Sequence, residues 1–226
     1  MKYESITKAQ FVSRPNRFIA HCKVNGADEI VHVKNTGRCR ELLTPGATVY
    51  LEKSNNPNRK TQYDLVCVEK GDILINMDSQ APNKAALEWL AAGKLIKAPT
   101  LVRPETKYNN SRFDFYIESK NEKAFVEVKG VTLENNKIAM FPDAPTTRGT
   151  KHINELICAK NERYRAVILF VVQMKGCTVF KPNAATDPAF ASALKKAQKA
   201  GIEILATDCI VTPDEMIIDK TVPTDI

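Results

Sequence analysis

The sequence predicts a two-domain protein of mixed α and β structure, in which a small β-barrel precedes a mixed β-sheet flanked by helices. Three observations support this prediction. Residues 1–78 break into short apolar segments between turn residues, residues 84–93 carry a helical periodicity, and residues 166–172 form a continuous apolar run of strand length. A chain of 226 residues is long enough for two such units.

The first domain is predicted from five strand-like segments, which are residues 17–24, 29–33, 48–52, 64–69 and 72–76. Turn markers such as Asn25-Gly26 and Pro45-Gly46 separate them. Five strands in this length are typical of an OB-like barrel. Because residues 79–83 resemble a linker in composition, we expect a first domain over residues 1–80 and a second over residues 81–226.

The second domain is predicted to begin with an amphipathic helix over residues 84–93, which ends at Gly93. Two strands over residues 111–118 and 124–130 follow, then a polar loop over residues 132–147. The remaining elements are a helix over 149–164, a strand over 166–172 that should be buried on both faces, a helix over 187–200 and a strand over 202–206. This order indicates a mixed sheet covered by helices, in the α+β or α/β class.

The charge balance favours a polyanionic partner. The chain has 33 Lys and Arg against 26 Asp and Glu, a net charge of +7 and a pI near 9.0, although a merely solvated basic surface would give the same count. Its six cysteines form no C-x-x-C pair and are expected to be reduced core thiols. No apolar run approaches the roughly 18 residues of a membrane span, so we expect a cytoplasmic protein without membrane contact.

The pattern with the clearest chemistry is two acids and a lysine on neighbouring strands. If Lys120 and Asn121 form the tip of a tight hairpin, Asp114 lies directly opposite Glu127, and Lys129 lies one step further along the same face. Two facing carboxylates repel each other unless a cation neutralises them, and Mg²⁺ is usually bound by one or two carboxylates. The pattern therefore predicts a metal site for phosphodiester hydrolysis, with a structural ion pair as the open alternative.

Further side chains could complete such a site. Glu88, on the first helix of the second domain, is a possible third acid, or else an exposed helical glutamate. Arg148 and His152 lie on one stripe of the later helix and could bind a phosphate. The remaining candidates for nucleic-acid contact are Arg112 and the polar loop of residues 32–41, with Asn35, Arg38 and Arg40, for which a charged turn is the alternative.

Four segments together carry a family resemblance: HVKNTGRCRELLTPG (32–46), SRFDFY (111–116), FVEVKG (125–130) and FPDAPTTRGTKHINEL (141–156). The chain closely resembles the sugar fermentation stimulation protein A family over both domains. The resemblance implies an OB-like domain followed by a domain similar to the PD-(D/E)XK nucleases. Asp114 then matches the first acid, Glu127 and Lys129 match the acid-x-lysine pair, and Glu88 resembles the helical acid of some nucleases.

From these observations we expect a cytoplasmic DNA-binding protein whose second domain is a Mg²⁺-dependent or Mn²⁺-dependent nuclease. Asp114 and Glu127 would hold the metal, Lys129 would position or activate water, and Glu88 would support a ligand. Two alternatives stay open. One is a non-catalytic DNA-binding regulator of sugar metabolism genes, and the other is a nuclease that processes RNA with the same residues.

Overall fold

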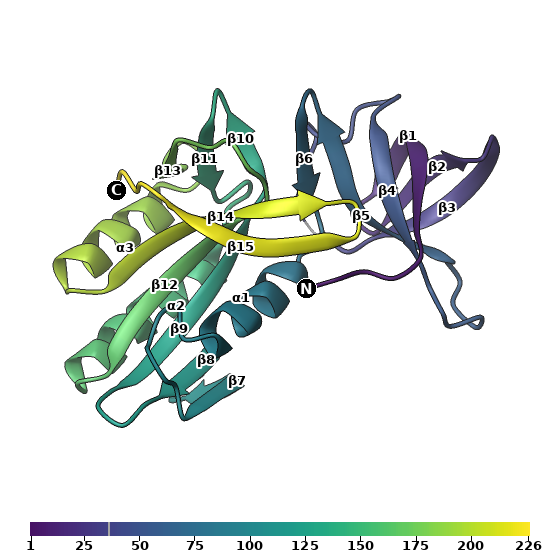
Figure 1. Cartoon of the computed structure of the whole chain (residues 1–226). Helices are drawn as coiled ribbons and strands as arrows, with labels where there is room; N and C mark the ends of the chain where they lie inside the picture. Colours follow the sequence, from purple (N-terminus) through teal and green to yellow (C-terminus); the bar gives the residue numbers. More distant parts are fainter. Residues whose placement is uncertain (36) are drawn as a thin grey trace.

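The structure is a computed structural model that describes residues 1–35 and 37–226. Figure 1 shows a barrel built from the N-terminal third of the chain and, beside it, a sheet flanked by helices. A hairpin of β14 (Glu203–Thr212) and β15 (Glu215–Val222) extends from the second unit toward the barrel, where β14 contacts β6 (Ile73–Asn76). No helix among the described residues combines the length and the apolar content needed to cross a membrane.

The first unit is the predicted OB-like barrel, with six strands in the order β3-β2-β1-β4-β5-β6 and a parallel β3–β5 pairing that closes it. Its interior is filled by apolar side chains with no solvent exposure, among them Val31, Val49, Leu51 and Leu65. The strands are β1 (Ile6–Asn16), β2 (Ile19–Val24), β3 (Ala27–Val33), β4 (Thr48–Lys53), β5 (Tyr63–Lys70) and β6 (Ile73–Asn76). The prediction missed β1 and extended β2 back into the turn that joins them.

The second unit contains the predicted mixed sheet, in the order β15-β14-β12-β9-β8-β7. The three central strands are parallel, and the outer ones pair antiparallel. As predicted, the central strand β12 is buried on both faces over residues 166–172. The strands are β7 (Leu101–Tyr108), β8 (Ser111–Glu118), β9 (Lys123–Val131), β12 (Arg165–Val172), β14 (Glu203–Thr212) and β15 (Glu215–Val222).

The three helices cover the two faces of this sheet. Helix α1 (Ala81–Ala91) packs on the face that carries Phe115 and Leu169, while α2 (Thr147–Asn161) and α3 (Pro188–Lys199) cover the face of Phe113 and Phe170. Successive residues of β12 thus enter different cores, with Ile168 and Phe170 on one face and Leu169 and Val171 on the other, as the pleat of a strand requires. The side chains of Thr146 and Asp187 cap α2 and α3 by accepting hydrogen bonds from backbone amides of the first turn.

The segment predicted as a polar loop over residues 132–147 contains a short hairpin. Its strands β10 (Leu133–Asn135) and β11 (Ile138–Phe141) are joined by Asn136 and Lys137, both with positive φ angles, and β11 pairs in parallel with β13 (Val179–Pro182). Two consecutive residues with positive φ are the mark of a primed hairpin turn. The loop prediction was wrong here because the strands are too short to show a clear period.

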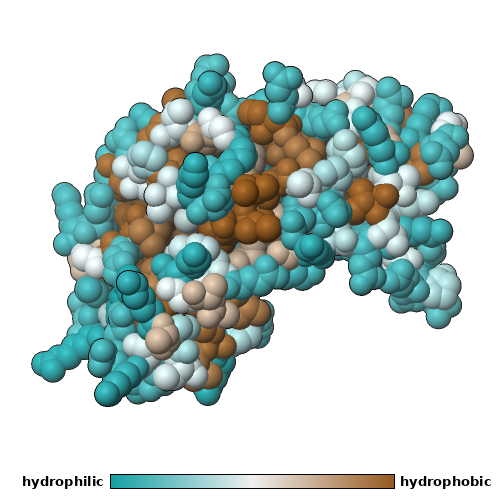
Figure 2. Space-filling model, viewed as in Figure 1, coloured by the Kyte–Doolittle hydropathy of each residue, from teal (hydrophilic) through white to brown (hydrophobic). Residues whose placement is uncertain are grey.

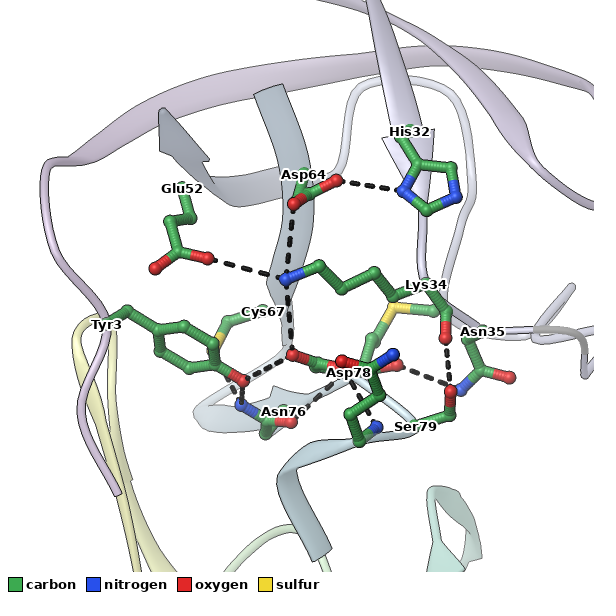
Figure 3. A network of polar contacts seen from close by, with 12 residues as sticks. Tyr3, His32, Lys34, Asn35, Glu52, Asp64, Cys67, Asn76, Asp78 and Ser79 are labelled. Atoms are coloured by element: carbon green, nitrogen blue, oxygen red, sulfur yellow. Dashed lines mark hydrogen bonds and ion pairs between the residues drawn. The ribbon is translucent and has the colours of Figure 1, made fainter. Parts of the chain in front are cut away.

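A polar network around Asp78 (Figure 3) is joined to the second unit through Gln173. The amine of Lys34, at the end of β3, lies 3.2 Å from Asp64 and 3.6 Å from Asp78, which follows the last barrel strand and is fully buried. Tyr3 contacts both Asp78 and Asn76, at 3.3 and 2.8 Å. Gln173, just after β12, donates to the side-chain and backbone oxygens of Asn76 and to the backbone oxygen of Asp78. Side chains of the barrel and of the second unit are therefore hydrogen-bonded into one network.

The surface in Figure 2 is largely hydrophilic, with apolar side chains gathered near the middle of the view, in the region of β14 and β15. Ile210 and Ile217 pair across this hairpin and are 45% and 42% exposed. Apolar atoms contribute more than half of the accessible surface of folded proteins, so a small exposed apolar pair of this kind is ordinary.

Candidate functional site: an acidic pair beside a lysine and a histidine

The β8–β9 hairpin has the register that a tip at Lys120 and Asn121 predicts. Phe115 pairs with Val126, and Glu118 pairs with Lys123. At Asp114 a side-chain contact replaces the next backbone pairing, since its Oδ2 accepts a hydrogen bond of 2.8 Å from the amide of Val128. The other oxygen, Oδ1, accepts a bond of 2.8 Å from Asn83 of α1. The Asp114 carboxylate is thus held in place by the next strand and by the covering helix.

The two carboxylate oxygens of Glu127 have different environments. Its side chain is 2% exposed, and Oε1 accepts a hydrogen bond of 2.5 Å from Lys129 and contacts Nδ1 of His152 on α2. Oε2 is buried and has no partner among the described residues. A buried carboxylate oxygen without a donor carries a large desolvation penalty, which a ligand with positive charge would relieve.

The electrostatic environments of the two acids differ. Burial raises the pKa of Asp114 above its usual value, and the negative charge of Glu127 raises it further. Burial would also raise the pKa of Glu127, but the hydrogen bond from His152 and the charge of Lys129 outweigh it and hold that pKa below its usual value. The effect of Glu127 on Asp114 indicates that the two carboxylates are close enough to interact.

His152, which was predicted to bind a phosphate together with Arg148, is placed against Glu127 in the structure. Its side chain is 8% exposed and faces Glu127, so it is placed to orient a carboxylate. Arg148, one turn earlier on α2, lies with its Nε 3.5 Å from Nε2 of this ring. On this stripe of α2, the His152 side chain therefore points into the protein, whereas Arg148 lines a surface groove described below.

Glu88 requires a correction, because the structure does not bring it to the acidic pair. Its carboxylate binds the amino group of Met1 at 2.7 Å, and its side chain is 61% exposed. Helix α1 presents Asn83 to Asp114, and Glu88 lies five residues further along this helix. Sequence analysis placed Asn83 in a linker and missed it, although Pro82 next to it is a typical residue of a first helical turn.

The predicted nucleic-acid contacts have different environments. Asn35 uses both ends of its side chain inside the protein, donating to Met77 and accepting from the amide of Gly37. Arg38 and Arg40 line a surface groove, where the Arg38 amide is bonded to Asp143. Arg112 forms an exposed ion pair of 3.1 Å with Glu105. Thr36, in the predicted loop, lies outside the described residues.

No cluster of three or more His, Cys, Asp or Glu that could hold a metal is present in residues 1–35 and 37–226. The candidate centre is instead a pair of carboxylates with a lysine and a histidine. Such a centre suits a cation that takes its remaining oxygen ligands from water or substrate, as Mg²⁺ does.

The fold and this centre define a class of two-domain proteins, in which an OB-like barrel precedes a helix-flanked mixed sheet that carries an acidic pair. Two family models match the chain. One is described as the N-terminal OB domain of SfsA and matches residues 12–77, and the other is the sugar fermentation stimulation protein RE domain, which matches residues 80–215. The chain belongs to the sugar fermentation stimulation protein family.

Relatives match over nearly the whole chain. The sugar fermentation stimulation protein homolog of Ruminiclostridium cellulolyticum is 55% identical over 222 residues, which is 98% of each chain. The homolog of Clostridium beijerinckii is also 55% identical, over 96% of each chain. The solved structure of Pyrococcus furiosus SfsA in complex with Ca²⁺ is 30% identical, with a TM-score of 0.91 over 100% of this chain and 98% of the other.

Proposed function

We propose that this protein is a Mg²⁺-dependent or Mn²⁺-dependent phosphodiester hydrolase that binds DNA. The observation that carries the proposal is the arrangement of Asp114, Glu127 and Lys129. The half-buried carboxylate of Asp114 and the buried carboxylate of Glu127, from adjacent strands, interact with each other. One oxygen of Glu127 has no partner among the described residues, and the lysine amine lies 2.5 Å from the other. Two acids with a lysine are the residue types needed to hold a cation and to act on a phosphate.

The residues present fit a divalent cation. The unpartnered Oε2 of Glu127 is a buried acceptor, and burial, followed by the negative charge of Glu127, raises the pKa of Asp114. Carboxylate oxygens suit both Mg²⁺ and Ca²⁺, which are hard cations. The Pyrococcus furiosus relative, solved in complex with Ca²⁺, supports the choice of a divalent ion.

The side chains suggest a division of labour. When bound, the ion would supply positive charge for the phosphoryl oxygens and would lower the pKa of an attacking water. Lys129 would orient that water or balance charge that develops on the phosphate. His152 and Asn83 would fix the two carboxylates through hydrogen bonds, as groups around metal ligands commonly do. Arg148 would bind the substrate phosphate beside them.

The proposed partner follows from the charge balance and from the barrel. The chain has a net charge of +7, and OB-like barrels commonly bind single-stranded nucleic acids. We retain as a proposal the division into an OB-like domain over residues 1–80 and a nuclease-like domain over residues 81–226. All six cysteines are free thiols, and four of them are buried, which suits a reducing compartment such as the cytoplasm.

The test combines metal binding with cleavage. Calorimetry with Mg²⁺ and Mn²⁺ should show binding to the wild type and a loss of at least about tenfold in affinity for Asp114→Asn, since one of two carboxylate ligands is removed. Cleavage of linear, circular, single-stranded and branched DNA should require the ion and should be abolished in Lys129→Ala. Binding of DNA should stay within a few-fold, because the lysine acts mainly on the transition state.

Lys120→Ala is the matched control for the lysine substitution. Glu118 and Lys120 repeat the acid-x-lysine spacing at the hairpin tip, but Glu118 pairs with Lys123 and lies outside the acidic pair. The control should cleave at the wild-type rate. Absence of divalent-ion binding at millimolar concentration would refute the metal site. DNA binding without cleavage on any substrate would favour the non-catalytic regulator, and cleavage confined to RNA would favour the RNA-processing enzyme.

A further inference from the structure

Two grooves on this molecule are lined by several cations and by no acidic side chain. The α2 groove has a volume of about 800 Å³ and is lined by Lys107, Arg112, Arg148 and Lys151, together with His152. The barrel groove has a volume of about 630 Å³ and is lined by Arg14, Arg17, Arg38 and Arg40. In a chain with 26 acidic residues, two such surfaces free of acids are suited to a polyanion.

The barrel groove is held in shape by Arg14. Its guanidinium donates hydrogen bonds to four backbone carbonyls, those of Arg17, Asn35, Gly37 and Arg38, at 2.6 to 2.9 Å. These bonds hold the backbone of Arg17, Asn35, Gly37 and Arg38 without using the side chains of Arg38 and Arg40, which form no ion pair among the described residues. A loop that is ordered before binding loses less entropy when it takes up a ligand.

The barrel groove also has an aromatic neighbour. Phe18, in the turn between β1 and β2, is 45% exposed, and the guanidinium of Arg17 lies 4.7 Å from the centre of its ring. An exposed aromatic ring beside a guanidinium can stack on a nucleobase while the cations contact phosphates.

A small polar hollow adjoins the barrel groove and β9, the strand that carries Glu127 and Lys129. It has a volume of about 200 Å³ and is lined by Gly37, Gly130, Thr132, Asp143 and Gln173 among others. Gly37 also lines the barrel groove, and Gly130 follows Lys129 in the chain. On the other side, His152 lines the α2 groove and contacts Glu127. The acidic pair therefore lies between the two basic grooves.

We propose that one nucleic-acid chain occupies both grooves and passes over the acidic pair between them, so that the barrel forms part of the substrate site. This inference rests on the proposed function and extends it to Lys107, Lys151 and Arg17. A substrate long enough to reach both grooves gains from two linked binding events, and a short one fills a single groove. The affinity of the protein for a nucleic acid thus depends on the length of that nucleic acid, because both grooves contribute to the binding of a long chain.

The test measures DNA binding by fluorescence anisotropy in the presence of EDTA, so that no cleavage interferes. One double variant, Lys107→Ala with Lys151→Ala, removes charge from the α2 groove, and another, Arg17→Ala with Arg40→Ala, removes it from the barrel groove. The control, Lys196→Ala with Lys199→Ala, removes two charges from the last turn of α3. Single-stranded oligonucleotides of about 4 and about 30 nucleotides are compared, since one OB fold covers roughly 4–16.

On the long oligonucleotide each groove variant should bind at least about tenfold more weakly. The slope of log K against log salt should fall by about 1.4, since each single-strand phosphate contact contributes roughly 0.7. On the short oligonucleotide each variant alone should lose less than about threefold, and all four substitutions together should abolish binding. The control should match the wild type. Groove variants that behave like the control, or that weaken short and long oligonucleotides equally, would overturn the proposal.

The experiments distinguish the shared nucleic-acid path from the proposed catalysis. Length-dependent binding through both grooves in a protein that cleaves no substrate would support the shared path and refute the hydrolase. Metal-dependent cleavage that is unchanged in both groove variants on long and short substrates would support the hydrolase and refute the shared path.

Discussion

Replacing Lys34 with methionine should destabilise the junction between barrel and sheet (Figure 3). The Lys34 side chain is 17% exposed, and within the described chain it is the cation paired with the fully buried Asp78. Asp64 keeps Arg59 and His32 as partners, so the uncompensated charge falls mainly on Asp78. Breaking a buried pair by removing one partner costs roughly 3–5 kcal/mol.

The expected loss can be expressed as a melting temperature. For a chain of this size, 1 kcal/mol corresponds to about 2–4 °C, so Lys34→Met should melt about 6–20 °C below the wild type. Thermal denaturation followed by circular dichroism measures this shift. Lys53→Met, which removes an exposed lysine at the end of β4, is the control and should melt within about 2 °C of the wild type.

A second substitution tests the cause of the shift. Asp78→Asn in the Lys34→Met background removes the orphan charge and keeps one oxygen, which can still accept the hydrogen bond from the Gln80 amide, while the bond that Tyr3 donates to the other oxygen is lost. The double variant should therefore be more stable than Lys34→Met alone. A single variant that melts with the control, or a double variant that is less stable than the single one, would refute the electrostatic explanation.

Two further predictions concern pH and packing. Burial opposes the charge of Asp64, but Arg59, His32 and Lys34 hold its pKa below the usual value, so its contribution to stability is present above about pH 4 and is lost as pH falls below that value. Urea denaturation between pH 6 and pH 3 should show a smaller loss of stability for Asp64→Asn than for the wild type, and equal losses would contradict the assignment. A Cβ at Gly130 would lie 2.5 Å from Gln173 and 2.7 Å from Pro82. Gly130→Ala should therefore lower the unfolding free energy by about 1–3 kcal/mol, and unchanged stability in urea would show that these neighbours can move.

The strands that were predicted correctly are those whose burial requires a periodic or continuous pattern of apolar residues in the sequence. The β12 segment is apolar throughout and lies between two parallel neighbours, so its sequence indicates its position. By contrast, β1 buries Ala9 and Phe11 in a mostly polar segment, and its pairing with β2 is irregular between Phe11 and Asn16. The edge strand β7 contains Pro104, which is a signal against a strand.

The candidate site was partly predictable because part of it depends on local geometry. The register of the β8–β9 hairpin follows from its turn, and that register brings Asp114 and Glu127 to neighbouring strands. The contacts of Asn83 and His152 depend on how α1 and α2 pack on the sheet. Residue spacing carries no information about packing of this kind. For the same reason spacing suggested Glu88 as a third acid, although the structure places Glu88 beside Met1.

The structure also bears on whether Glu127 and Lys129 are simply a structural ion pair. A structural pair needs one acid and one base, and Glu127 with Lys129 already satisfies that need. Asp114 adds a second, half-buried acid, whose pKa is raised by partial burial and by Glu127, while the pKa of Glu127 is lowered. Neighbouring acids whose pKa values diverge in this way are typical of functional sites, because a stable core gains nothing from the repulsion. The arrangement therefore favours a binding site for a cation over a purely structural ion pair.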